Sequence, residues 1–246
     1  MKGSSRVATA MVTAVPPVIS RQPAPQGVQG PFFYKVRTFD VQSFLDSAGA
    51  SKKQLALQRN EVIFAQGDPA GSVFYIQKGV VKLSVTSYAG KRAVLTVLGP
   101  GNFFGVWCLA GQPRRTATVT AMASTTVRVI PKEQILRLLR TDRAFADYFI
   151  AFLLARNIRI AQQVVNLLFD STERRLIRAL LFLTQFGTKK SNDEVTLSRV
   201  SQELLAEMIG STRTHVNGLL RKLKRLGFVE YTGGLKIHPS PLMSLL

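Results

Sequence analysis

The chain has 246 residues, with 33 Lys or Arg against 14 Asp or Glu, which gives a formal net charge of +19. Such a charge predicts attraction to polyanions, meaning nucleic acid or an anionic membrane surface, and says nothing about the fold. One cysteine excludes an intrachain disulfide and a four-thiolate iron–sulfur cluster, and two histidines with it are too few for a zinc site, so no metal ligands are expected.

The sequence also indicates where in the cell the protein is expected. A membrane span takes roughly 20 apolar residues. The longest candidate, residues 144–155, is shorter and carries Asp147, so no membrane partner is expected. The N-terminal apolar run is weak and is broken by Pro16 and Pro17, so export is not expected either. With one cysteine, the reducing cytoplasm is the expected setting.

Residues 1–37 carry only cations among their charged residues, together with several prolines and scattered Gly and Ser. This composition predicts a disordered basic arm. Two roles remain open for the arm: a solvated tail without a task, or a segment that grips DNA.

Residues 38–134 are expected to form a β domain. From about residue 56 to residue 130, short runs rich in β-branched and aromatic residues alternate with turn signals. Val81, Leu83 and Val85 would share one face of a strand, and glycines recur ten to twelve residues apart between positions 67 and 111. Short alternating strands at this spacing predict an antiparallel sandwich, barrel or jelly roll.

Residues 135–169 are expected to hold a long helix. Apolar residues step by three and four along it, which is a heptad seam with one polar member, Asn157. A lone seam Asn commonly fixes register and two-strandedness. The seam predicts a homodimer, the alternative being a helix packed on its own β domain. Its members are Ile150, Leu153, Asn157, Ile160, Val164 and Leu167.

Residues 170–246 are expected to form a second domain. Ser171 and Glu173 signal the start of a helix that Gly187 ends, and a polar loop should follow over residues 188–194. Ser201 can cap the next helix. The last segment, FVEYTGGLKIHP, predicts two short strands joined near Gly233 and Gly234.

The stretch GSTRTHVNGLLRKLKRLG, residues 210–227, lies between that capped helix and those strands. Gly210 permits a tight turn, and Ser211 or Thr212 can cap a second amphipathic helix. Two such helices joined by so short a turn predict a helix-turn-helix, with the terminal hairpin as a wing. The buried stripe of the second helix should comprise Val216, Leu219, Leu220, Leu223 and Leu226.

The outer face of that second helix carries the chemistry of base and phosphate recognition. Arg matches the two acceptors of guanine, Asn matches the adenine edge, and the helix N-terminus is the end that enters the major groove. A solvated basic helix is the simpler alternative, and His215 could be a phosphate or a packing contact. The residues expected to contact DNA are Ser201, Gln202, Ser211, Thr212, Arg213, Thr214, His215, Asn217 and Arg221.

These segments resemble the cyclic-AMP receptor protein and fumarate–nitrate-reduction regulator (CRP/FNR) superfamily of bacterial transcription factors. Residues 209–223 are similar to its recognition helix, residues 67–85 to the start of its β-roll, and residues 164–181 to its hinge. The resemblance covers roughly residues 38–240. It implies an α+β protein: an antiparallel β-roll of the cyclic-nucleotide-binding type, a long dimerisation helix and a C-terminal winged helix-turn-helix.

The resemblance also implies partners. A homodimer would bind a palindromic promoter site in double-stranded DNA, with RNA polymerase as a further partner and Arg213 in the place of the family's guanine-reading Arg. Thr214 and Gly218 stand where family members that read known half-sites carry Glu and Arg. The target sequence should therefore differ, with Asn217 as a candidate replacement reader.

The family's nucleotide cassette corresponds to residues 105–117, GVWCLAGQPRRTA. Arg115 and Thr116 match the phosphate-holding pair, but Val106 occupies the position of the ribose-binding Glu and accepts no hydrogen bond. Each unmet buried polar group costs ~1–3 kcal/mol, so cyclic AMP should bind weakly or not at all. The expected effector-pocket residues are Gly105, Val106, Trp107, Cys108, Arg115, Thr116, Asn157, Ile160 and Ala161.

Three interpretations of this pocket remain open: another ligand, more apolar or anionic, near Trp107 and Arg115; a pocket filled by its own side chains in a constitutively active protein; or a redox or haem contact at Cys108. Cys108 could equally be a buried core residue, and Arg115 a structural one. No cofactor is expected.

The predicted function is a homodimeric, sequence-specific transcription regulator that does not respond to cyclic AMP. The alternative is a module that binds a cyclic nucleotide or another small effector and uses its C-terminal domain for protein contacts. A non-specific nucleoid protein is also conceivable. No catalytic residues are expected, because the sequence holds no phosphate-binding loop, nucleophile–His–acid set or paired-carboxylate pocket.

Overall fold

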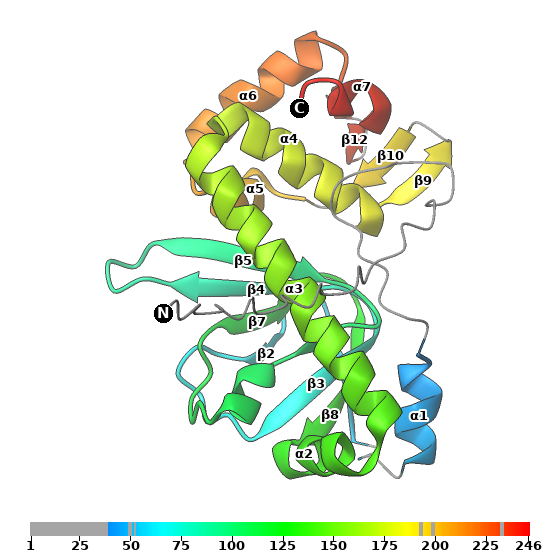
Figure 1. Cartoon of the computed structure of the whole chain (residues 1–246). Helices are drawn as coiled ribbons and strands as arrows, with labels where there is room; N and C mark the ends of the chain where they lie inside the picture. Colours follow the sequence, from blue (N-terminus) through cyan, green and yellow to red (C-terminus); the bar gives the residue numbers. More distant parts are fainter. Residues whose placement is uncertain (1–38, 49–50, 52, 192–193, 198–199, 232–233) are drawn as a thin grey trace, which may run out of the picture. The chain divides into compact units, whose positions relative to one another are not determined.

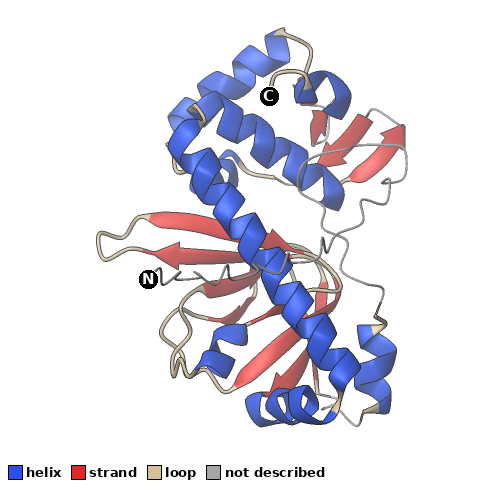
Figure 2. Ribbon diagram, in the orientation of Figure 1, coloured by secondary structure: helices blue, strands red, loops and turns tan. Residues whose placement is uncertain are grey.

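The structure is a computed structural model that describes residues 39–48, 51, 53–191, 194–197, 200–231 and 234–246. Figure 1 labels its helices and strands, and Figure 2 distinguishes them by type. The expected basic arm, residues 1–37, lies outside the described residues, as does Gly233 of the expected wing turn.

Two four-stranded antiparallel sheets form the β-roll, which confirms the predicted class of fold. The first has the order β1 (Gln54–Leu57), β8 (Thr125–Pro131), β3 (Ser72–Lys78) and β6 (Phe103–Phe104). The second has the order β2 (Val62–Phe64), β7 (Thr118–Ala121), β4 (Val81–Thr86) and β5 (Arg92–Leu98).

Strand β3 is buried on both faces because its alternate residues enter two different cores. Phe74 and Ile76 pack between the two sheets, together with Leu83 and Val119 of the second sheet. Residues one position away face helices instead: Val73 and Tyr75 pack with Phe103 and the helical residues of a second cluster. Burying each such side chain is worth ~1.5–3 kcal/mol.

Three helices cover the outer face of the β3–β8 sheet: α1 (Val41–Ser47), α2 (Lys132–Thr141) and α3 (Arg143–Phe169). The sequence analysis did not anticipate α1. Asp142 separates α2 from α3, and its side chain accepts a hydrogen bond from the Phe145 N–H at 2.7 Å. That bond satisfies one of the free donors at the start of α3.

Helix α3 has two apolar stripes rather than one. Phe145, Phe149 and Phe152, at spacings of four and three, are buried against the β-roll. The predicted heptad seam lies on another face and is exposed in the single chain, its apolar members being between 36% and 58% exposed. The alternative prediction, a helix packed on its own β domain, is therefore correct for the phenylalanine stripe. The seam stays exposed in the single chain.

The C-terminal region begins with α4 (Thr172–Leu183), which Ser171 caps by accepting from the Arg174 N–H. A short helix η2 (Thr184–Phe186) follows, then β9 (Thr188–Ser191), β10 (Glu194–Leu197), α5 (Gln202–Ile209), α6 (Arg213–Arg225), β11 (Val229–Tyr231), β12 (Leu235–Ile237) and α7 (Pro239–Met243). The hydrophobic side chains of α4, α5 and α6 pack in one core with those of the strands.

The predicted hairpin is confirmed, but it belongs to a larger sheet of order β11-β12-β10-β9. The prediction of a polar loop over residues 188–194 was wrong, because β9 occupies residues 188–191. Among the described strands, β9 lies at the edge of this sheet and pairs with β10 alone. An edge strand can be polar, so the hydrophobic pattern gave no signal for it.

No helix in the described part of the chain has both the length and the apolar character needed to cross a membrane.

Gly79, between β3 and β4, yields a stability prediction. Its φ is +88°, and an added Cβ would lie 2.4 Å from Thr125 Oγ1 and 2.5 Å from the Ser124 carbonyl oxygen. Gly79→Ala should therefore lower the free energy of unfolding by more than the ~1–2 kcal/mol of left-handed strain alone. Gly90 is the matched control, because its φ is +74° and nothing lies within 4 Å of an added Cβ. Chemical denaturation measures both variants, and equal losses would contradict the predicted clash.

Candidate nucleic-acid interface and effector pocket

Capping residues define the turn between α5 and α6. Ser201 Oγ accepts from the Leu204 N–H at 3.1 Å, as expected for the cap of α5. Gly210 ends that helix in the left-handed conformation, with φ +64°. Thr212, rather than Ser211, caps α6, since its Oγ1 accepts from the His215 N–H at 3.2 Å. Only Gly210 and Ser211 thus lie between Ile209, the last residue of α5, and Thr212, the cap of α6.

Helix α6 is divided lengthwise into a buried and an exposed face. Val216, Leu220 and Leu223 are buried, and Leu219 is half-buried. The prediction that Leu226 belongs to this stripe was wrong: it is 55% exposed, because the helix ends at Arg225 and Leu226 lies beyond the last turn.

The residues expected to contact DNA lie on α6 and at the start of α5. Gln202, Ser211 and Asn217 are half-buried, and the other members are exposed: Ser201, Thr212, Arg213, Thr214, His215 and Arg221. Gln202 Nε2 lies 3.4 Å from Asn217 Oδ1, so the side chain that starts one helix reaches the middle of the next.

Hydrogen bonds and ion pairs distinguish the cations of α6. Lys222 Nζ lies 2.8 Å from Glu173 Oε2 of α4. Within the described residues, the side chains of Arg213, Arg221, Lys224 and Arg225 form no ion pair. His215 Nδ1 lies 3.2 Å from Ser211 Oγ, which holds the imidazole near the N-terminal turn of the helix. The exposed face of α6 therefore carries a cation in its first turn and a cluster of cations from Arg221 onward.

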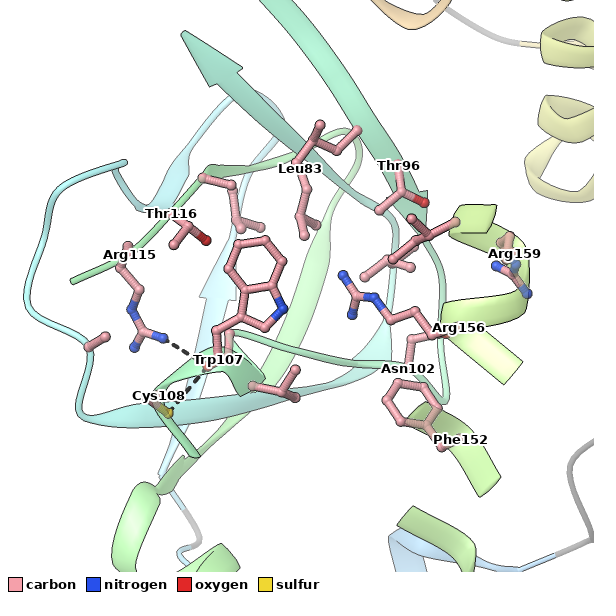
Figure 3. A pocket seen from close by; sticks show the side chains of 18 of the residues that line it. Leu83, Thr96, Asn102, Trp107, Cys108, Arg115, Thr116, Phe152, Arg156 and Arg159 are labelled. Atoms are coloured by element: carbon pink, nitrogen blue, oxygen red, sulfur yellow. Dashed lines mark hydrogen bonds between the residues drawn. The ribbon is translucent and has the colours of Figure 1, made fainter. Parts of the chain in front are cut away.

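A cavity of about 300 Å³ lies between the β-roll and α3 (Figure 3). Seven of the nine expected effector-pocket residues line it: Gly105, Val106, Trp107, Cys108, Arg115, Thr116 and Ile160. The other two, Asn157 and Ala161, are exposed on α3 and are not among the lining residues.

Arg115 is the most buried cation of the cavity, at 6% exposed. Its Nη1 donates to the Gly105 carbonyl at 3.2 Å and its Nη2 to Ser72 Oγ at 3.2 Å, while its guanidinium carbon lies 4.3 Å from the centre of the Phe64 ring. Desolvation lowers the pKa of the group. Its buried Nε has no hydrogen-bond partner within the described structure.

Helix η1 (Val106–Ala110) forms part of the cavity wall. Val106 is buried, whereas the Trp107 side chain is 48% exposed. Cys108 is buried, and burial raises the pKa of its thiol, so the sulfur is neutral at ordinary pH. The structure thus fits the interpretation of Cys108 as a small core residue. Among the described residues, no group of His, Cys, Asp and Glu side chains could hold a metal ion.

The sequence analysis missed three further cations that line the cavity: Arg114 beside Arg115, and Arg156 and Arg159 of α3. The two α3 residues continue the buried stripe of that helix, because Phe145, Phe149, Phe152, Arg156 and Arg159 follow one another at steps of four, three, four and three. Burial lowers the pKa of both guanidinium groups, and the charge of Arg159 lowers that of Arg156 further. Extending the aromatic stripe by two turns would have identified them.

Comparisons with known proteins follow the same division of the chain. The cyclic nucleotide-binding domain family matches residues 54–142, and the Crp-like helix-turn-helix domain family matches residues 174–239. The global nitrogen regulator of Nostoc sp. is 31% identical over 170 residues, which are 68% of this chain and 76% of that protein. The cyclic AMP receptor protein of Thermus thermophilus is 31% identical over 173 residues, which are 70% and 77% of the two chains.

The chain belongs to the CRP/FNR family of transcription regulators. The predicted family is thereby confirmed, and regulation of transcription by a helix-turn-helix protein is not an enzymatic function. The solved structure of the c-di-GMP-responsive global regulator CLP from Xanthomonas campestris has the same fold, with a TM-score of 0.68 and 22% identity over 81% of this chain and 99% of that one.

Proposed function

We propose that two copies of this chain bind a palindromic promoter site as a homodimer and regulate transcription without responding to cyclic AMP. The observation that carries the proposal is the N-terminal turn of α6. Its capped end presents Arg213 and Thr214 to solvent, while Val216 anchors the opposite face in the core. A helix N-terminus with exposed polar side chains is the part that enters the major groove in helix-turn-helix proteins.

The positions of the charges on α6 support different roles for the two ends of the helix. Arg213 lies in the first turn, where a guanidinium can reach the two acceptors of guanine. Lys224 and Arg225 lie in the last turn and suit contacts with phosphates, which position a protein on DNA without reading its sequence. Asn217 can donate from its amide nitrogen while Gln202 holds its oxygen, and we infer that it contacts a base.

The seam of α3 supports the homodimer. Five apolar members lie exposed along one face, and Asn157 is exposed among them. A second α3 would remove this surface from water, which is the driving force of most protein association. We infer that residues 135–169 are the dimerisation region, that they separate the β-roll (residues 38–134) from the DNA-binding domain (residues 170–246), and that the protein acts in the cytoplasm with RNA polymerase as a partner.

The cavity supports independence from cyclic AMP. Val106 is buried in the cavity wall, where relatives of the nucleotide-binding type carry a Glu, and an alkyl group accepts no hydrogen bond from a ribose hydroxyl. Ile160 of α3 also lines the cavity and offers no polar partner to a base. A hydroxyl or amide buried without a partner loses ~1–3 kcal/mol.

Replacing Arg213 tests the base-reading role. Arg213→Ala should weaken binding to the selected operator by ~1–3 kcal/mol and relax base preference at one position of each half-site. The operator is first identified by selection from genomic fragments, and affinities are then measured on operator and scrambled DNA. Lys224→Ala is the control, since loss of a phosphate contact should weaken binding to both DNAs alike and reduce the salt dependence. Equal losses on both DNAs for Arg213→Ala would show that Arg213 contacts phosphate only.

Replacing Val164 tests the dimer. Val164→Asp places a carboxylate in the seam beyond the cavity and should shift the protein to monomer at micromolar concentration, because two buried like charges would face each other. Gln162→Asp is the matched control on the same helix, since Gln162 is exposed and lies off the seam. Sedimentation or light scattering measures the mass. A Val164→Asp protein that remains dimeric would refute the seam as the interface.

Titration calorimetry with cyclic AMP and cyclic GMP tests the effector inference. We expect no binding at micromolar concentration and no change in operator affinity, because the cavity lacks the hydrogen-bond acceptor for the ribose. Micromolar binding without any effect on DNA affinity would favour a regulatory module whose C-terminal domain serves protein contacts.

A further inference from the structure

One side-chain amide connects three elements of the C-terminal region. Gln202 is the first residue of α5 and directly follows its cap, Ser201. Its Nε2 lies 3.4 Å from Asn217 Oδ1 on α6, and its side chain also hydrogen-bonds Tyr231 at the end of β11. The start of one helix, the helix that carries the expected base readers and a strand of the wing therefore meet at a single polar group.

The pleat of β11 brings Tyr231 to Gln202. Val229 and Tyr231 are two residues apart, so their side chains lie on the same face of the strand. Val229 is fully buried in the core that contains the apolar side chains of α5 and α6, whereas Tyr231 is 44% exposed. The Tyr231 ring thus lies at the rim of the face that packs on the helices, where its hydroxyl can meet a half-buried amide.

The direction of the hydrogen bonds follows from their effect on the phenol. Burial raises the pKa of Tyr231, and the hydrogen bond with Gln202 lowers it. A hydrogen bond that favours the phenolate is donated to its oxygen, so the amide nitrogen of Gln202 is the donor. An amide nitrogen carries two N–H groups. One serves Tyr231 and the other serves Asn217 Oδ1, so both donors of Gln202 are used within the protein.

The engaged oxygen of Asn217 changes what this residue offers to DNA. An asparagine that reads adenine needs both ends of its amide, because it accepts from N6 and donates to N7. With Oδ1 turned toward Gln202, Asn217 offers a base the donors of Nδ2. Guanine O6 and thymine O4 accept such donors in the major groove, whereas adenine and cytosine place an amino group there.

We propose that Tyr231 and Gln202 fix the amide of Asn217 so that it selects guanine or thymine, rather than adenine or cytosine, at one position of each half-site. Tyr231 is a positioning residue, since it acts through Gln202. The inference rests on the proposed function, because it takes α6 as the helix that enters the major groove. It differs from the adenine match that the residue type of Asn217 alone suggests, and it makes a wing residue part of base recognition.

Base preference at that position tests the proposal. Operators are selected from a randomised library with the full-length protein, and the position is the one whose preference disappears in Asn217→Ala. Affinities for the four base pairs at this position are then measured. We expect guanine or thymine on the contacted strand to bind about tenfold more tightly than adenine or cytosine, as for one specific side-chain contact with a base.

Gln202→Glu should reverse the preference. An ionised carboxylate has no N–H donor and would accept from Asn217 Nδ2, which turns Oδ1 toward the DNA. Adenine or cytosine should then bind more tightly than guanine or thymine. The added negative charge also weakens binding, but it does so for all four base pairs alike, so the ratio of affinities isolates the orientation of Asn217.

Tyr231→Phe tests the wing residue. Loss of the hydroxyl removes one of the two partners that orient Gln202, so the preference should fall about threefold, as expected for one hydrogen bond. Tyr88→Phe is the matched control, because it removes the same atom from a fully exposed ring on the hairpin between β4 and β5. It should leave the preference unchanged.

Nuclear magnetic resonance of the free protein tests the contact without DNA. In Tyr231→Phe the side-chain amide signals of Gln202 and Asn217 should both shift, and in Tyr88→Phe neither should. Unmoved signals in Tyr231→Phe would overturn the three-residue contact.

The remaining outcomes separate this inference from the proposed function. A wild-type preference for adenine, or one base preference shared by the wild type, Gln202→Glu and Tyr231→Phe, rejects the positioning role while sequence-specific binding stands. A uniform loss of affinity in the variants would then show a structural role only. Selection of no operator by the wild type would instead reject the proposed function and with it the base preference, and the amide signals would decide the contact by themselves.

Discussion

The docking of α3 on the β-roll is the interaction on which the rest of the structure depends. Phe103, at the edge of the first sheet, is surrounded by Phe145, Phe149 and Phe152 of α3, with ring centres 5.4–6.4 Å apart and planes inclined by 70–72°. Edge-to-face contacts of this kind are directional. They therefore determine not only that the helix packs here but also its rotation about its own axis.

That rotation determines which side chains of α3 face the sheet, which face the cavity and which face solvent. With the phenylalanines turned to the sheet, Arg156 and Arg159 face the cavity, because they continue the same stripe. The seam from Ile150 to Leu167 is then left in solvent. One set of aromatic contacts thus places arginines of α3 at the cavity and leaves an apolar surface of the same helix exposed, and Ile160 belongs to both.

A helix or strand could be predicted from the sequence where the burial that forms it leaves a regular apolar pattern. The strands of the β-roll and the two amphipathic helices around Gly210 were readable because each buries an apolar face with a regular period. β9 was not readable, because the sequence TKKS of this edge strand carries no such pattern. Helix α1 was missed because it has only seven residues, too few to show a helical period, although Val41, Phe44 and Leu45 pack in the core.

The residues of the two candidate sites also differ in whether the sequence predicts them. Arg213 and its neighbours follow from a cap and a turn that are local in sequence, so their exposure could be expected. Arg156 comes to the cavity only through the packing of phenylalanines one to three turns earlier. The sequence left open whether α3 packs on its own β domain, but it did not predict that the packing stripe begins with aromatic residues and continues with cations.

Burial of the lone thiol has a practical consequence. Cys108 is covered and held in its neutral form, and such thiols react slowly with maleimides and thiosulfonates. A second cysteine introduced at an exposed position of α6 would therefore be modified selectively, without removal of the natural one. A spin label or fluorophore attached there would mark one known point per chain, so that the spacing between the two copies of the proposed homodimer becomes a measurable length in solution.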